Sequence, residues 1–327
     1  MILSILLLAG GLVLLFAGGE LLVRGSVRLA VGLGISPLVI GLTVVGFGTS
    51  TPELVTSVQA ALRDTPGIAI GNIVGSNIAN ILLIVGLSSL VYPIAIDSRG
   101  LKRDGAIMLA VAVVFAVLSA VMPLGRGIGL ALLAALVVYV AVIVRIEMRD
   151  ARSEHGAIFD KARALEEVDP ELDPERPQPH SPLVSLGLCL IGLALLVAGG
   201  HLLVDGAVDL ARGLGISETV IGLTIVAVGT SLPELVTSLV AAFRREADVA
   251  FGNIVGSNIY NILGIGGATA AISPLTVPQD IVTFDNIAMT AVSAVLLLVA
   301  WTGMRISRVE GAALLAAYAG YVYLIWP

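Results

Sequence analysis

Charged residues are scarce in this sequence. Only 13% of its 327 residues are Asp, Glu, Lys or Arg, whereas 57% are hydrophobic and the mean hydropathy is +1.02. Because ordinary soluble domains are about 25% charged, this composition excludes a globular protein that folds in water. The single cysteine, Cys189, excludes an intramolecular disulfide and falls in an apolar run, where we expect it to serve packing.

Long apolar runs recur from one end of the chain to the other. A run of about 18 or more apolar residues can cross ~30 Å of hydrocarbon as a helix. We therefore predict an all-α integral membrane protein with ten transmembrane helices, whose partners are the lipid bilayer and small ions rather than nucleic acid. The predicted spans are 2–23, 37–61, 67–91, 104–122, 126–146, 183–206, 219–243, 249–272, 282–302 and 308–325.

The basic residues are distributed unevenly between the loops. When the loops are placed alternately on two sides, fifteen of the eighteen Lys and Arg residues fall on one side and only Arg63, Arg126 and Arg212 on the other. Cytoplasmic loops collect basic residues. The pattern thus predicts a multi-pass protein of the cell (plasma or inner) membrane, with both termini outside and the 148–181 loop in the cytoplasm.

The sequence repeats itself at an offset of 181 residues. GTSTPELVTS at 48–57 returns as GTSLPELVTS at 229–238, and GNIVGSNI at 71–78 returns unchanged at 252–259. Each copy holds five predicted spans, and an odd number implies that the second copy enters the membrane in the opposite orientation. Inverted repeats of this kind are common in secondary transporters, whose substrate sites lie near the midplane where the repeats meet.

The repeat divides the chain into three parts. We predict a first five-helix repeat at 1–147, an acidic and Pro-rich cytoplasmic linker at 148–181, and a second, inverted repeat at 182–327. Alternating acids at 169–175 in the linker could form a regulatory cation site. Two prolines interrupt them, however, and no glycine supplies the turn of an EF-hand loop, so a solvated linker is the favoured interpretation.

The GTSxPE segments interrupt two otherwise apolar spans. A proline inside a helix leaves the carbonyl four residues earlier without its N–H partner, which predicts a break at Pro52 and at Pro233. Unwound carbonyls at membrane depth coordinate cations in transporters. Glu53 follows Thr49 by four residues, as Glu234 follows Thr230, so we expect each carboxylate to share a helix face with a threonine.

The following spans carry a polar stripe at four-residue spacing. It consists of Asn72, Ser76 and Asn80 in the first repeat and Asn253, Ser257 and Asn261 in the second. Nearby glycines at 71, 75, 252 and 256 would let these helices approach a neighbour closely. Hydrogen bonding between helices without ions is the alternative explanation for the stripe.

Two glutamates in mid-membrane need compensation, since a charge there costs roughly 2.5–3.5 kcal/mol on insertion scales. No Lys, Arg or His lies near the middle of any predicted span, so each carboxylate is either protonated, as a structural helix contact, or bound to a cation. An all-oxygen ligand set suits sodium, calcium or protons rather than zinc or copper. Two carboxylates balance one Ca2+ or two Na+, which gives competition between the ions a physical basis.

At these residues the sequence resembles the sodium/calcium exchanger family, whose two alpha repeats carry a GTSxPE segment followed by a GNxxGSNIxN-like segment. The resemblance implies ten helices, sodium-driven calcium movement and no cofactor. It also implies that Glu53 and Glu234 are the shared carboxylates, Thr49 and Thr230 carbonyl ligands, and Ser50, Ser76, Ser231 and Ser257 sodium ligands, with Asn80 and Asn261 at the polar core positions.

Asn261 departs from those members of the superfamily that carry an aspartate there, including potassium-dependent ones, and this argues against potassium dependence. The predicted function is Na+/Ca2+ antiport by alternating access. A Ca2+/H+ exchanger on the same fold and a passive cation channel are the alternatives. The spans hold no nucleophile and base pair, so we do not expect an enzyme.

Charged residues near the span ends have a simpler explanation. Glu20 and Arg24, and Asp205, Asp209 and Arg212, lie at helical spacings and predict interfacial ion pairs. His201 occupies the repeat position of Glu20 and could titrate near neutral pH, although interfacial packing is the favoured interpretation.

Overall fold

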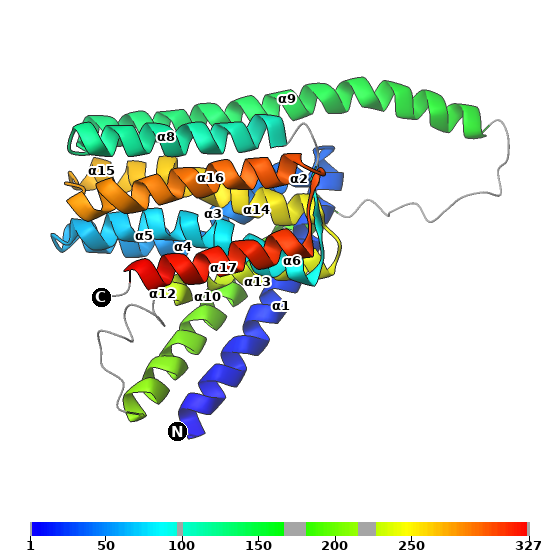
Figure 1. Ribbon diagram of the computed structural model, residues 1–327. Helices are drawn as coiled ribbons and strands as arrows, with labels where there is room; N and C mark the ends of the chain where they lie inside the picture. The colour runs from blue at the N-terminus through cyan, green and yellow to red at the C-terminus, as the bar shows by residue number, and fades with distance from the viewer. Residues whose placement is uncertain (1, 97–100, 167–180, 215–226, 326–327) are drawn as a thin grey trace.

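The computed structural model describes residues 2–96, 101–166, 181–214 and 227–325, and nearly all of them are helical (Figure 1). Helices satisfy every backbone polar group internally, as a chain in lipid requires. The elements of the first half are α1 (Ile2–Leu33), α2 (Pro37–Ile40), η1 (Gly41–Val45), α3 (Gly46–Thr49), α4 (Thr51–Leu62), α5 (Pro66–Ala79), η2 (Asn80–Val85), α6 (Gly86–Val91), β1 (Ile94–Ala95), η3 (Leu101–Gly105), α8 (Ala106–Val121) and α9 (Arg126–Glu166). Those of the second half are α10 (Pro182–Gly213), α12 (Ala227–Thr230), α13 (Leu232–Phe243), α14 (Ala247–Tyr260), η5 (Asn261–Gly266), α15 (Gly267–Ile272), η6 (Ile281–Asp285), α16 (Asn286–Trp301), β2 (Arg305–Ile306) and α17 (Arg308–Ile325).

The helices confirm an all-α membrane protein. Six of the described helices are long and apolar enough to cross a membrane, and the bent pair Pro37–Thr49 and Thr51–Leu62 makes a seventh. Large apolar side chains such as Val13, Val121 and Leu183 are exposed, as expected for surfaces that face lipid. The other predicted spans coincide with α13, α14–α15 and α17, which do not reach the same length and apolarity, so the count of ten remains a prediction.

The sequence repeat has structural counterparts at the same offset of 181 residues. The π-helical turns η2 and η5 begin at Asn80 and Asn261, and a left-handed residue lies two positions after the end of both α4 and α13, namely Asp64 with φ 54° and Arg245 with φ 62°. The short strands have counterparts as well: β1 pairs antiparallel with β2, and Leu124 bridges Leu275, one residue from the register that the offset gives. These local features thus recur in the described parts of both halves.

Helices α1 and α10 form a long antiparallel pair that is inclined to the other helices (Figure 1). Small residues line their contact at seven-residue intervals in both helices, namely Ser4, Gly11, Gly18 and Gly25 in α1 and Ser185, Gly192, Gly199 and Gly206 in α10. A Cβ added at Gly18 would lie 2.7 Å from the Gly192 carbonyl oxygen, and one at Gly199 would lie 2.8 Å from that of Gly11. Small residues allow this close backbone approach. We did not predict this glycine series from the sequence.

Helix α9 is longer than predicted. The predicted span ends at residue 146 and a solvated linker was expected from 148, but the helix continues to Glu166 and extends beyond the bundle (Figure 1). The extension is rich in Ala, Glu and Arg, which are strong helix formers, and it contains no proline. The predicted helix end at residue 146 is therefore too early, while the solvated linker at 148–181 stays a prediction. The rest of the predicted linker, including the acids at 169–175, lies outside the described residues.

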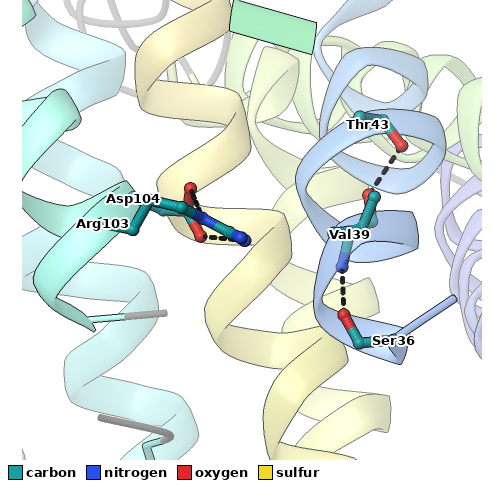
Figure 2. A network of polar contacts seen from close by, with 5 residues as sticks. All are labelled: Ser36, Val39, Thr43, Arg103 and Asp104. Carbon is teal, nitrogen blue, oxygen red and sulfur yellow. Dashed lines mark hydrogen bonds and ion pairs between the residues drawn. The ribbon is translucent and has the colours of Figure 1, made fainter. Parts of the chain in front are cut away.

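The core surrounds α14, where every residue from Val249 to Ile259 is buried. Two polar features flank this part of the bundle (Figure 2). Ser36 caps α2 by accepting a hydrogen bond from the Val39 N–H, and Thr43 donates to the Val39 carbonyl at 2.6 Å. On η3, Arg103 donates to both oxygens of the buried Asp104 at 3.0 Å.

Candidate cation-binding site

Two helices are interrupted at equivalent serines in the middle of the bundle. Ser50 separates α3 from α4 and Ser231 separates α12 from α13, with nearly the same backbone angles (φ −81°, ψ 11° and φ −90°, ψ 9°). The first pair of helices is bent by 45° at this point. A break was predicted at each proline, and the structure places it two residues earlier, because Pro52 and Pro233 lie in the first turn of the new helix, where proline needs no N–H partner.

The sequence suggested that Pro52 leaves the Gly48 carbonyl without a partner, but the structure shows one. This carbonyl accepts a hydrogen bond of 2.8 Å from the Thr51 hydroxyl. The break instead brings Glu53 and Glu234 into the first turns of α4 and α13. Both glutamates are buried, with 1% and 2% of their surface exposed. The positive end of a helix dipole favours a negative charge in its first turn, which offsets part of the cost of burying these carboxylates.

The two broken helices exchange side-chain contacts. Ser50 donates a hydrogen bond of 2.7 Å to Glu234 Oε1, and Ser231 donates one of 3.0 Å to Glu53 Oε1. We call these four residues the carboxylate layer. The expected sharing of one helix face by Thr49 and Glu53 is not observed, because the break at Ser50 lies between them. The Thr49 hydroxyl donates to the Gly46 carbonyl and to Asn253 Oδ1 instead.

Asn72 and Asn253 support the carboxylate layer from the neighbouring helices. The Asn72 amide donates to the Glu53 carbonyl at 3.1 Å and to the Ser57 hydroxyl at 2.8 Å. The Asn253 amide repeats both contacts with Glu234, at 3.3 Å, and with Ser238, at 2.9 Å. The sequence placed the two asparagines in the polar stripe but missed the two serines, which end the repeated TPELVTS and LPELVTS segments, four residues after each glutamate.

A second group of amides lies where α5 and α14 pass into their π-helical turns. Asn80 donates a hydrogen bond of 2.9 Å to Asn258 Oδ1, and the Asn258 amide approaches the Met108 sulfur at 3.6 Å. The repeat equivalents of Asn80 and Asn258 are Asn261 and Asn77. Neither polar atom of the buried Asn261 has a hydrogen-bond partner among the described residues. We call these four asparagines the amide layer.

The other predicted ligands are placed less uniformly. Ser257 is buried and donates to the Gly46 carbonyl at 3.1 Å, which ties α14 to α3. Ser76 is buried on α5, one turn before Asn80, and Thr230 at the end of α12 is partly buried. Gly46 allows the close approach of α14, because a Cβ there would lie 2.9 Å from the Ser257 nitrogen.

The carboxylate layer has unused acceptor capacity. Glu53 Oε2 and Glu234 Oε2 are buried and have no hydrogen-bond partner among the described residues, and no described Lys or Arg lies within 4 Å of either carboxylate. No group of three or more His, Cys, Asp or Glu side chains that could hold a metal ion occurs in the described ranges. Fold and site together define an ion-translocating membrane protein with an enclosed, oxygen-lined centre.

Comparison with known proteins places the chain in a family. The sequence profile of the sodium/calcium exchanger protein family matches residues 3–145 and 184–326, two segments that start and end 181 residues apart. The chain therefore belongs to the sodium/calcium exchanger family, and it is a cation/calcium exchanger rather than a member of a catalytic enzyme class.

Individual relatives agree with this assignment along the whole chain. CaxA of Alkalimonas amylolytica is 38% identical over 97% of this chain and 96% of its own length. The sodium/calcium exchanger MaX1 of Methanosarcina acetivorans is 35% identical, over 99% and 98%. The structure of the sodium-calcium exchanger NCX_Mj soaked with Na+ and Sr2+ superimposes with a TM-score of 0.82 at 33% identity, covering 100% of this chain and 99% of that one.

Proposed function

We propose that the protein exchanges Na+ for Ca2+ by alternating access, with the cations bound between the two broken helices. The observation that carries this proposal is the carboxylate layer: two buried glutamates from opposite halves, each with one oxygen bound to a serine of the other half and one oxygen unpartnered. The ions would be bound by the carboxylates together with Thr49, Thr230, Ser50, Ser231, Ser76, Ser257, Asn80 and Asn261.

Charge and ligand type support this ion pair. Two carboxylates carry the charge that one Ca2+ or two Na+ would neutralise, so either ion can replace the other without leaving a net charge in the membrane. Calcium takes about six to eight oxygen ligands, which carboxylate, hydroxyl, amide and carbonyl groups of this centre can supply. The names of MaX1 and NCX_Mj, which describe sodium/calcium exchangers, point to the same ions.

The architecture supports alternating access. We propose two inverted five-helix repeats at 1–147 and 182–327, joined through 148–181. The antiparallel course of the equivalent helices α1 and α10 and the exchange of Ser–Glu contacts between the halves favour this arrangement. In an inverted repeat, each half can adopt the conformation of the other, which opens the same site to opposite sides of the membrane.

Calcium flux into proteoliposomes tests the proposal. With purified protein, an outward Na+ gradient should drive 45Ca2+ uptake, whereas an equal outward K+ gradient should not. Uptake driven by a pH gradient and indifferent to Na+ would overturn Na+ coupling and favour Ca2+/H+ exchange. Calcium flux that merely follows the calcium gradient would favour a channel.

Orientation can be tested with the chain's own chemistry. Cys189 is its single cysteine and is buried, so Cys189→Ala gives a background without thiols. A cysteine placed at Ser153 should be protected from a membrane-impermeant maleimide in intact cells, and one inserted next to Met1 should react. The reverse result would contradict the proposed outward termini and cytoplasmic 148–181 segment.

A further inference from the structure

Asn77 and Asn258 occupy equivalent repeat positions but make different contacts. Asn258 accepts the Asn80 amide at 2.9 Å and directs its own amide to the Met108 sulfur. Asn77 instead donates to the Ile73 carbonyl of its own helix at 2.7 Å, and its Oδ1 is buried without a partner among the described residues. The series of contacts from Asn80 through Asn258 to Met108 is therefore complete, whereas the equivalent series in the other half is not formed.

All the residues needed for the unformed series of contacts are present in the sequence. The repeat offset converts Asn80, Asn258 and Met108 into Asn261, Asn77 and Met289, and Met289 is fully buried. The three unpartnered atoms are Asn261 Nδ2, Asn261 Oδ1 and Asn77 Oδ1. An Asn261 amide that donated to Asn77 Oδ1 would satisfy two of them at once. Because both halves carry these same three residue types, the two series of contacts differ in conformation and not in their residues.

We propose that Asn258 and Asn77 are positioning residues that orient the site amides alternately, one in each of the two access states. In the state described here, Asn258 holds the Asn80 amide so that Asn80 Oδ1, which is buried and unpartnered, remains available to a cation. In the opposite state, Asn77 would hold Asn261 in the same way. This inference rests on the proposed function, since it assumes exchange between two access states.

The physical reason for such positioning is that the two ends of a carboxamide differ chemically. Its oxygen can bind a cation and its NH2 group cannot, so a site asparagine contributes only if a neighbour fixes which end faces the ion. Outer-shell partners that orient a metal ligand typically change metal affinity by about 10–100-fold when they are removed. A hydrogen bond made in only one of two states also shifts the equilibrium between them.

The decisive test compares calcium binding at the two faces of the membrane. We would measure the KM for 45Ca2+ at each membrane face by Ca2+/Ca2+ self-exchange, which needs no sodium coupling, in oriented proteoliposomes. Asn258→Ala should shift the ratio of the two KM values by roughly tenfold, the scale typical of lost outer-shell partners. Asn77→Ala should shift it in the opposite direction. Asn258→Asp retains the acceptor oxygen for Asn80 and should not reproduce the shift seen with Asn258→Ala.

Asn286→Ala is the matched control. Asn286 is an equally buried asparagine whose side chain donates one hydrogen bond, to Ser119, and has an unpartnered Oδ1, but it forms no hydrogen bond with the described residues of the amide layer. Its removal should leave the KM ratio unchanged. Equal effects of Asn77→Ala and Asn258→Ala on both faces, or an unchanged ratio in folded protein, would overturn the inference. Loss of sodium dependence with self-exchange retained would contradict the proposed coupling and leave this test intact.

Discussion

The carboxylate layer and the amide layer follow the repeat to different degrees. In the carboxylate layer, the contact of Ser50 with Glu234 is matched by that of Ser231 with Glu53. In the amide layer, Asn80 contacts Asn258, but Asn261 has no hydrogen-bond partner among the described residues. The residues of both layers are identical in the two halves, so the difference does not come from the residue types within the layers.

This contrast separates two tasks within one centre. A symmetric set of contacts has no reason to change when two similar halves exchange conformations, whereas an asymmetric one must change. We therefore expect the carboxylate layer to govern whether cations bind and the amide layer to report which side the centre faces. The surface offers a third case. Glu20 and its repeat equivalent His201 are different residue types, so this asymmetry is the same in every conformation.

The largest expected effect follows from removing charge in the symmetric layer. Glu53→Gln and Glu234→Gln keep the size of the side chain and an acceptor for the partner serine, but each removes half of the negative charge. Without it, a divalent cation is no longer neutralised in a medium where uncompensated charge is costly. Sodium-driven 45Ca2+ uptake should fall to background in both variants, and to the same extent.

Glu246→Gln is the control for this pair. Glu246 lies between α13 and α14, outside the centre, where burial raises the pKa of its carboxyl, as does the nearby Asp248. Its replacement should leave uptake near the wild-type rate. Full uptake by a folded Glu53→Gln or Glu234→Gln protein would contradict the site, and a large difference between the two would contradict the equivalence of the halves.

A smaller effect is expected from the asparagines that support the glutamates. Asn72→Ala and Asn253→Ala each remove an amide that bonds the glutamate carbonyl and a serine of the same helix. Loss of an outer-shell contact should raise the KM for calcium by about tenfold while leaving most of the maximal rate. Initial rates of uptake over a calcium series would show this. A change in maximal rate alone would assign these asparagines to conformational exchange rather than to binding.

The sequence predicted which residues meet at the centre better than which contacts they make. The repeat and the residue types identified Glu53 and Glu234, because lipid leaves few explanations for a carboxylate that has no nearby base. The pairing of each glutamate with the serine of the opposite half was not predictable, since contacts between repeats depend on how the helices cross. The same limit applies to the α1–α10 contact, although its glycines recur every seven residues.

Local rules also failed where two of them competed. A proline inside an apolar run predicted a break at Pro52, but the structure uses that proline as a helix start and breaks at Ser50. The helical extension to Glu166 was missed because a polar segment was interpreted as solvated linker, although its residues favour helix. Helix positions, by contrast, followed from apolar run length alone in most of the first half.

A moderate loss of stability is expected where the halves approach most closely. A Cβ at Gly256 would clash with the Leu42 carbonyl, and one at Gly46 would lie 2.9 Å from the Ser257 nitrogen. Gly256→Ala should destabilise the folded protein by about 1–3 kcal/mol, as overpacking typically does. The added methyl group of Gly10→Ala meets no described atom within 4 Å, so this control should melt near the wild type. Thermal unfolding in detergent compares the two, and equal melting temperatures would contradict the close packing of α14.

The smallest effect is expected at Glu20, where the two halves carry different residue types. Glu20 pairs with Arg24 at 2.5 Å, as predicted, and also with Arg244 at the end of α13, which was not. The repeat equivalents of Glu20 and Arg244 are His201 and Arg63, which cannot form such a pair. Since these side chains are about one third exposed, Glu20→Gln should cost at most about 1 kcal/mol. This loss should disappear at high salt, because surface charges are screened there. The comparison requires unfolding at low and high ionic strength, with Asp64→Asn, an exposed carboxylate after α4 that forms no ion pair with a described residue, as the control. A loss that persists in high salt would mean that Glu20 acts through packing of α1 against α13 rather than through its charge, and the asymmetry between Glu20 and His201 would then be structural rather than electrostatic.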